Sequence, residues 1–215
     1  MVRETRQQIS LAAGAARVVQ GRYRGVPLLF CRTGIGPGNA HEGCEMLLEK
    51  FRPTQLISAG YCGGLRDGMK SGELLLPNEV LGEAGDRFSI DSSLAKHLSL
   101  LIHEERITCH EGRLLTVFHP LRTAQQKAEA GKGFSGVDME AATVAAVCEK
   151  QGIPFGCLKV VFDPVEMELP ITDRGRLDKK AFLKLPTLLK NHLACQRNLA
   201  RVLGRLLTSS SSITP

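Results

Sequence analysis

The stretch Gly136-Val137-Asp138-Met139-Glu140-Ala141-Ala142-Thr143-Val144-Ala145 places two carboxylates around a methionine, in front of a run of small residues. Its continuation predicts a helix over Met139–Lys150. A buried strand is predicted directly afterwards, because Gly156–Phe162 is apolar except for Lys159, and Asp163 follows that strand. A helix that leads into a buried strand is typical of an α/β fold.

The same alternation runs through the rest of the chain. Residues 15–32 predict a hairpin and 186–207 a long helix, in which Pro186 suits the first turn. We therefore expect one domain over residues 1–207, with a mixed, mostly parallel central sheet flanked by helices, and a disordered Ser-rich tail over 208–215. Between these limits, strands are expected at 55–59, 72–81 and 107–118 and helices at 40–50, 92–103 and 123–130.

Composition excludes several classes of protein. Hydrophobic residues make up 43% and charged residues 23%, which is typical of neither a membrane-embedded nor a mostly disordered chain. Because aromatic residues are only 5%, a base-stacking surface is poorly supplied and no nucleic-acid partner is expected. Seven cysteines without a CxxC pair, and no secretory signal, favour a reduced cytoplasmic protein. His41 and Cys44 lack further ligands at suitable spacing, so we expect no metal site and no cofactor.

Positive charge is concentrated near the C-terminus. Residues 174–205 contain nine basic residues and only Asp178 as an acid, whereas the rest of the chain has 19 basic and 21 acidic residues. The segment is compatible with a solvated helix face, with weak peripheral contact to an anionic membrane, or with nucleic acid. Its composition leaves these interpretations open.

Two glycine-rich segments follow predicted strands. The first has glycines at 34, 36 and 38, and the second is Gly60–Gly64. Ligands of α/β sheets bind beyond the carboxyl ends of strands, where glycine lets backbone N–H groups approach closely. Neither segment has the GxGxxG or Walker spacing. Each is therefore compatible with a tight turn as well as with a ligand contact.

The carboxylates near residues 138 and 163 also have two interpretations. Asp138 can cap the helix and Glu140 can complement its dipole. Asp163 can cap a loop. Alternatively, a carboxyl group at the end of a buried strand can have a raised pKa and hold a proton for delivery.

In combination, the segments Thr33–Gly38, Ser58–Pro77, Val137–Val147 and Pro154–Asp163 resemble the nucleoside phosphorylase and nucleosidase superfamily, in particular methylthioadenosine/S-adenosylhomocysteine nucleosidases. The Val-Asp-Met-Glu-Ala-Ala sequence is the most specific of the motifs. Residues 115–127, the loop 163–170 and the basic C-terminal segment most resemble the hopanoid-associated nucleosidase branch.

The resemblance implies hydrolysis of the ribose–purine bond in an adenosine-type nucleoside, by a homodimer or higher homo-oligomer without a cofactor. It implies that Asp163 delivers a proton to the leaving purine, that Glu140 accepts hydrogen bonds from the ribose diol and that Met139 packs against the sugar. Glu4 would position the attacking water. The remaining candidates for substrate binding are Phe118, His119, Tyr61, Gly63 and Gly34.

Three departures from the family pattern matter. The family has a strand before the glutamate that Glu4 matches, whereas this sequence begins almost at that residue, so either the start is misassigned or the sheet lacks the family's first strand. Phe162 stands where a serine commonly orients the catalytic aspartate. Ser58 and Tyr61 stand where phosphorylases place an Arg and a Ser on phosphate, which favours hydrolysis over phosphorolysis. A purine nucleoside phosphorylase and an inactive nucleoside-binding relative remain the alternatives.

Overall fold

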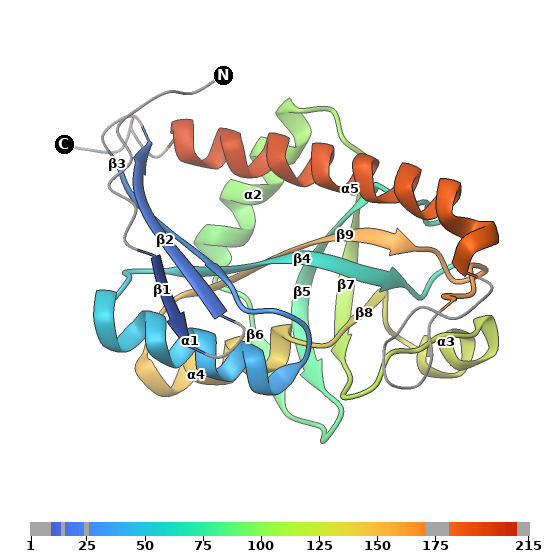
Figure 1. The fold of residues 1–215 in the computed structure, drawn as a ribbon, viewed down its shortest axis with the longest axis horizontal. Helices are drawn as coiled ribbons and strands as arrows, with labels where there is room; N and C mark the ends of the chain where they lie inside the picture. Colours follow the sequence, from blue (N-terminus) through green and yellow to red (C-terminus); the bar gives the residue numbers. More distant parts are fainter. Residues whose placement is uncertain (1–9, 14–15, 24–25, 171–180, 210–215) are drawn as a thin grey trace.

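The computed structural model describes residues 10–13, 16–23, 26–170 and 181–209. Over these residues it has nine strands and five helices, and it confirms the expected single α/β domain (Figure 1). The expected hairpin is present as β2 (Ala16–Tyr23) and β3 (Val26–Arg32), with β1 (Ser10–Ala13) pairing along the other edge of β2. This antiparallel sheet packs on α1 (Pro37–Phe51), where Met46 meets Ala16 and Val18.

The central sheet curls into a closed ring. Its strands lie in the order β6-β5-β7-β8-β4-β9, and a further pairing of β5 with β9 closes five of them on themselves. Three of the six pairings between described strands are parallel, so the sheet is mixed as expected, but parallel pairs are not in the majority. The strands are β4 (Leu56–Gly64), β5 (Leu74–Gly82), β6 (Arg87–Ser89), β7 (Cys109–Thr116), β8 (Gly136–Asp138) and β9 (Phe155–Asp163).

Two apolar layers cover this sheet. On one side α1 and α4 (Ala141–Gln151) bury residues such as Cys44, Val144 and Val161. On the other side α2 (Ser92–Glu104) and α5 (Ala181–Ser209) bury residues such as Leu98 and Val202. α3 (Ala124–Ala130) lies at one end of the sheet (Figure 1). All seven cysteines are free thiols and five are buried.

Helix α5 differs from expectation at its beginning and along its apolar face. It begins at Ala181, so Pro186 lies inside the helix and its missing N–H removes one bond of the helical ladder. Its second half packs on the core through Leu199, Val202, Leu203 and Leu206, whereas Leu185, Leu189 and Leu193 are more than half exposed. The stripe of leucines is therefore only partly core. No helix among the described residues combines the length and hydrophobicity needed to span a bilayer.

Several local details also depart from the sequence-based expectations. The second glycine segment is not a loop, since β4 runs through Gly64. Pro77 stays within β5, beside an irregularity in its pairing with β7 that accommodates the missing donor. The helical part of the C-terminal segment extends to Ser209, two residues beyond the expected 207, and the remainder of the expected tail lies outside the described residues.

Candidate functional site

Asp163 ends β9 as a buried carboxylate beside a buried cation. Lys127 on α3 places its Nζ 2.6 Å from the Asp163 Oδ2, and the lysine side chain is fully buried. Burial raises the pKa of Asp163 to about 6, although the Lys127 charge and hydrogen bond act to lower it. The sequence-based expectation of a raised pKa at this strand end therefore agrees with the structure. A carboxyl group in this state exchanges a proton near neutral pH.

Gly63 provides the space for this carboxylate. A bulge in the β4–β9 pairing sets Gly63 opposite Asp163, and Gly63 also pairs with Val137 of β8. A Cβ at Gly63 would lie 3.3 Å from the Asp163 Oδ2 and 3.1 Å from the Val137 Cγ1, closer than most such contacts. Gly63 therefore has a steric reason to be glycine, and it joins the end of β9 to the end of β8.

Asp138, at the end of β8, uses both of its carboxylate oxygens in structural hydrogen bonds. Its Oδ2 accepts a hydrogen bond from the Ala141 N–H (2.9 Å), and its Oδ1 accepts one from the Thr116 hydroxyl (2.7 Å). Lys159 Nζ lies 2.8 Å from the same carboxylate. The N-cap residue of α4 is Glu140, which makes no side-chain cap, and Asp138 caps the first helical N–H from two residues before Glu140. Burial acts against the charge of Lys159, but Asp138 raises the lysine pKa above its ordinary value.

Glu140 joins the first glycine segment to the acidic motif. The backbone N–H of Gly36 donates to the Glu140 Oε1 (2.7 Å), across 104 positions in the chain. Burial raises the pKa of Glu140, while this hydrogen bond opposes the rise. Gly34 lies two residues earlier in the same loop, and both glycines have positive φ angles that favour glycine. The loop and Glu140 therefore form one structural unit.

Met139, Phe118 and His119 are more exposed than the carboxylates of Asp138 and Asp163. Met139 is half-buried and packs against a small apolar cluster that includes Leu65, Val117 and Val137. Phe118 and His119 follow β7 and are exposed. The Phe118 N–H donates to Glu83 Oε2 (2.7 Å), which holds this backbone while leaving the ring open.

Tyr61 is the one described candidate that turns away. Its ring stacks on Phe162 with centroids 5.5 Å apart, and its hydroxyl lies 2.9 Å from the His192 Nδ1 on α5. The expectation that the Tyr61 side chain binds substrate has no support in these contacts, since they direct it toward α5. The same stacking gives Phe162 a packing role. Glu4 lies outside the described residues.

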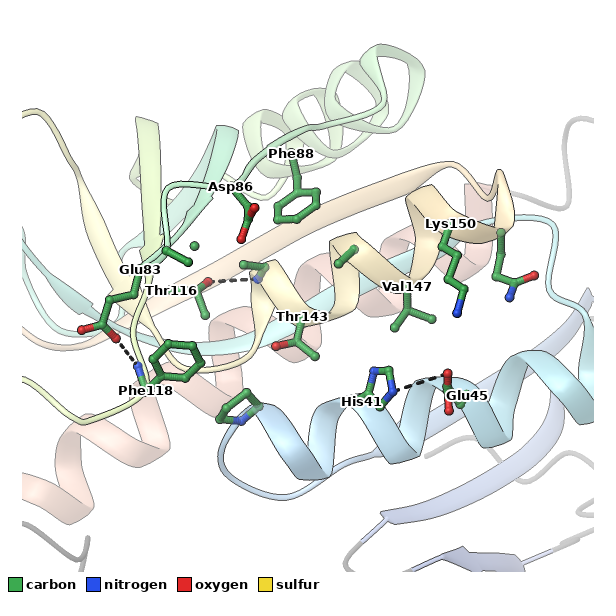
Figure 2. Close-up of a pocket in the computed structure, with 16 residues that line it drawn as sticks. His41, Glu45, Glu83, Asp86, Phe88, Thr116, Phe118, Thr143, Val147 and Lys150 are labelled. Carbon is green, nitrogen blue, oxygen red and sulfur yellow. Dashed lines mark hydrogen bonds and ion pairs between the residues drawn. The ribbon is translucent and has the colours of Figure 1, made fainter.

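A cavity of about 290 Å³ lies next to Phe118 (Figure 2). α1, α4 and the turn between β5 and β6 form its walls, and Phe118 is the only candidate within the described residues that lines it. His41 and Glu45 face each other across one turn of α1, with 3.4 Å between Nε2 and Oε1.

Lys127 is the residue that sequence reasoning missed as a neighbour of the acid. A single lysine in a short helix of Ala, Gln and Glu gives no local sign of burial.

Comparison with known proteins agrees with the fold. Residues 3–194 match the family model described as the phosphorylase superfamily. A curated 5'-methylthioadenosine/S-adenosylhomocysteine nucleosidase from Exiguobacterium sp. is 25% identical over 169 residues, which is 69% of this chain and 72% of that protein. One from Staphylococcus aureus is 23% identical and covers 72% of this chain and 76% of its own length.

Solved structures extend the similarity to nearly the whole chain. The nucleosidase of the same name from Neisseria meningitidis, in complex with methylthio-immucillin-A, superposes with a TM-score of 0.78 at 21% identity and covers 94% of this chain and 90% of its own. Futalosine hydrolase from Helicobacter pylori gives a TM-score of 0.75 at 18% identity, covering 93% and 89%. At these identities, the structural likeness concerns the fold.

Proposed function

Because this chain belongs to the phosphorylase superfamily, we propose that it is a nucleosidase that hydrolyses the N-glycosidic bond of an adenosine-type purine nucleoside and releases the base. The observation that carries the proposal is the junction at Gly63. There β4 lies between β8 and β9, so the strand that ends at Asp163 and the strand that leads to Glu140 are joined by one glycine. The two strands lead to two carboxyl groups whose pKa values are raised by burial, the half-buried Glu140 and the buried Asp163.

Asp163 is the proposed proton donor to the leaving purine. With a pKa near 6, part of the population carries the proton at neutral pH, and the acid is strong enough to release it. Protonation of the base makes it a better leaving group as positive charge develops on the sugar. Positioned proton transfer of this kind contributes about 10²–10⁴-fold.

Glu140 is the proposed acceptor of the ribose hydroxyl hydrogen bonds. Its hydrogen bond from Gly36 fixes the side chain before a substrate arrives, which reduces the cost of ordering it. In the same proposal Met139 packs against the sugar, Phe118 or His119 stacks on the base, and Glu4 positions the water. Gly34 and Gly63 allow the backbone to approach the nucleoside.

Hydrolysis is preferred to phosphorolysis because of the surroundings of Ser58. The nearest cation there is Lys159, whose Nζ donates to Ser58 Oγ (3.2 Å). Its charge is already balanced by Asp138, so it is poorly placed to hold a dianion. A purine nucleoside phosphorylase is the second candidate, and an inactive nucleoside-binding relative is the third.

The decisive experiment is purine release from methylthioadenosine, S-adenosylhomocysteine and adenosine, with and without phosphate. We expect release at a rate independent of phosphate, with free ribose derivatives as products. Ribose 1-phosphate as the main product would establish the phosphorylase alternative. Binding of these nucleosides without turnover would establish the inactive relative.

The assembly and cellular location implied by the resemblance are also proposals. We expect a homodimer or higher oligomer in the cytoplasm. Light scattering on the purified protein tests the first, and fractionation of cells tests the second.

A further inference from the structure

Three protons of one buried ammonium group are matched by three acceptors around Asp163. Lys127 Nζ lies 2.6 Å from the Asp163 carboxylate, 2.7 Å from the Met167 carbonyl and 2.9 Å from the Pro164 carbonyl. A lysine ammonium has three hydrogens to donate, so these contacts use all of them. The Asp163 carbonyl, at 3.4 Å, is a longer fourth neighbour.

The two carbonyls belong to a turn that starts at the acid. Met167 N–H donates to the Pro164 carbonyl (3.0 Å), which closes residues 164–167 around the ammonium. Lys127 thereby ties the carboxylate and the next four residues to α3. The helix itself is anchored, because Thr123 and Gln126 form a reciprocal capping box at its first turn. The acid is thus held by a rigid element rather than by the loop alone.

The same contact controls the charge of the acid. The other titratable groups near Asp163 are the thiols of Cys62 on β4 and Cys195 on α5, and both are neutral in their ordinary state. Burial alone favours a protonated Asp163, and Lys127 is the cation that opposes it. Phe162, next to the acid, turns its ring toward Tyr61 and offers no side-chain donor.

We propose that Lys127 is the positioning residue of the proton donor: it holds the Asp163 carboxyl group at the strand end and keeps its proton transferable. The proposal rests on the proposed role of Asp163 as the acid. No covalent step is assigned to Lys127. Asp163 gives its proton to the purine and becomes the carboxylate that the Lys127 contact stabilises.

The test compares Lys127→Met, which removes charge and donors, with Lys127→Gln, which removes the charge and keeps an amide donor. Lys132→Met is the matched control, because Lys132 is exposed just beyond α3. For each protein, kcat and kcat/KM of purine release are measured across the pH range. In both Lys127 variants we expect the low-pH plateau of kcat to fall at least ~10-fold. We also expect the alkaline limb of the kcat–pH profile to move to higher pH by about 1–3 pH units. The profile of the Lys132→Met control should coincide with that of the wild type.

A second measurement does not depend on activity. The Asp163 carboxyl is titrated by ¹³C NMR with labelled aspartate, and Asp163→Asn identifies its resonance. We expect the midpoint to rise in both Lys127 variants. If wild-type protein releases no purine, the proposed function fails while this titration still decides whether Lys127 controls the acid.

Two results would overturn the proposal. One is a folded Lys127 variant in which the alkaline limb of the kcat–pH profile and the midpoint of the Asp163 titration both coincide with those of the wild type. The other is failure of both variants to fold, as judged by circular dichroism, because Lys127 would then serve the fold alone.

Discussion

Replacing Asp163 by asparagine should change how the stability of the protein depends on pH. In the folded state, burial raises the pKa of this carboxyl from 3.8 to about 6 in spite of Lys127. The folded protein therefore binds the proton more tightly than the unfolded chain does. The resulting stabilisation is fully present below the unfolded pKa near 3.8, and it is lost as the pH rises through the folded pKa near 6.

The magnitude follows from the same values. A rise from 3.8 to about 6, at 1.36 kcal/mol per pKa unit, corresponds to about 3 kcal/mol. The asparagine side chain of the Asp163→Asn variant cannot titrate. The free energy of unfolding of the wild type, relative to that of Asp163→Asn, should therefore fall by about 2.4 kcal/mol between about pH 4 and about pH 7, and the rest of the difference lies below about pH 4.

Urea unfolding followed by circular dichroism at several pH values measures this difference, with the m-value checked for each protein. Asp67→Asn is the matched control, because Asp67 is exposed on the loop after β4. A wild type that gains stability over Asp163→Asn as the pH rises would refute the reasoning. It would mean that the charge of Lys127 outweighs burial and that the carboxyl group is an ordinary ion-paired aspartate.

Other perturbations test the remaining parts of the site. Asp163→Asn should also lower kcat of purine release at least ~10²-fold, and retention of a tenth of wild-type activity would remove Asp163 from its role. Glu140→Gln can still accept the Gly36 hydrogen bond, so we expect a loss of kcat/KM with a melting temperature near that of the wild type; the reverse pattern would make Glu140 structural. Gly63→Ala should reduce the free energy of unfolding by about 1–3 kcal/mol and impair purine release, as measured by urea unfolding and kinetics. A fully active and equally stable variant would show that the site has more space than the contacts indicate. The exposed leucines and basic residues of α5 predict weak, salt-sensitive flotation with anionic liposomes, and absence of bound protein at low ionic strength would contradict it. That binding should be lost on changing three lysines to glutamate, namely Lys179, Lys180 and Lys184.

Features that depend on near neighbours in the chain were predictable from the sequence. Apolar runs and periodic apolar positions located the longer strands and helices, including the continuous apolar strand that ends at Asp163, but not the short strands β1, β6 and β8. The cap formed by Asp138 was predictable as well, because it involves the N–H of a residue three positions later. Helix α5 shows the limit of this reasoning, since its leucine stripe does not distinguish the half that packs on the core from the half that is exposed.

The sequence by itself therefore determined the α/β class, the order of the longer elements and the position of the acid at a strand end. Only the tertiary structure decided which groups surround that acid. The ion pair joins Lys127 to Asp163 across 36 positions, and the Gly36–Glu140 hydrogen bond spans 104. Tyr61 turns to α5, where it meets His192, and its ring stacks on Phe162 of β9. Such contacts depend on how the closed sheet brings strand ends together, and local periodicity carries no information about which distant residues meet.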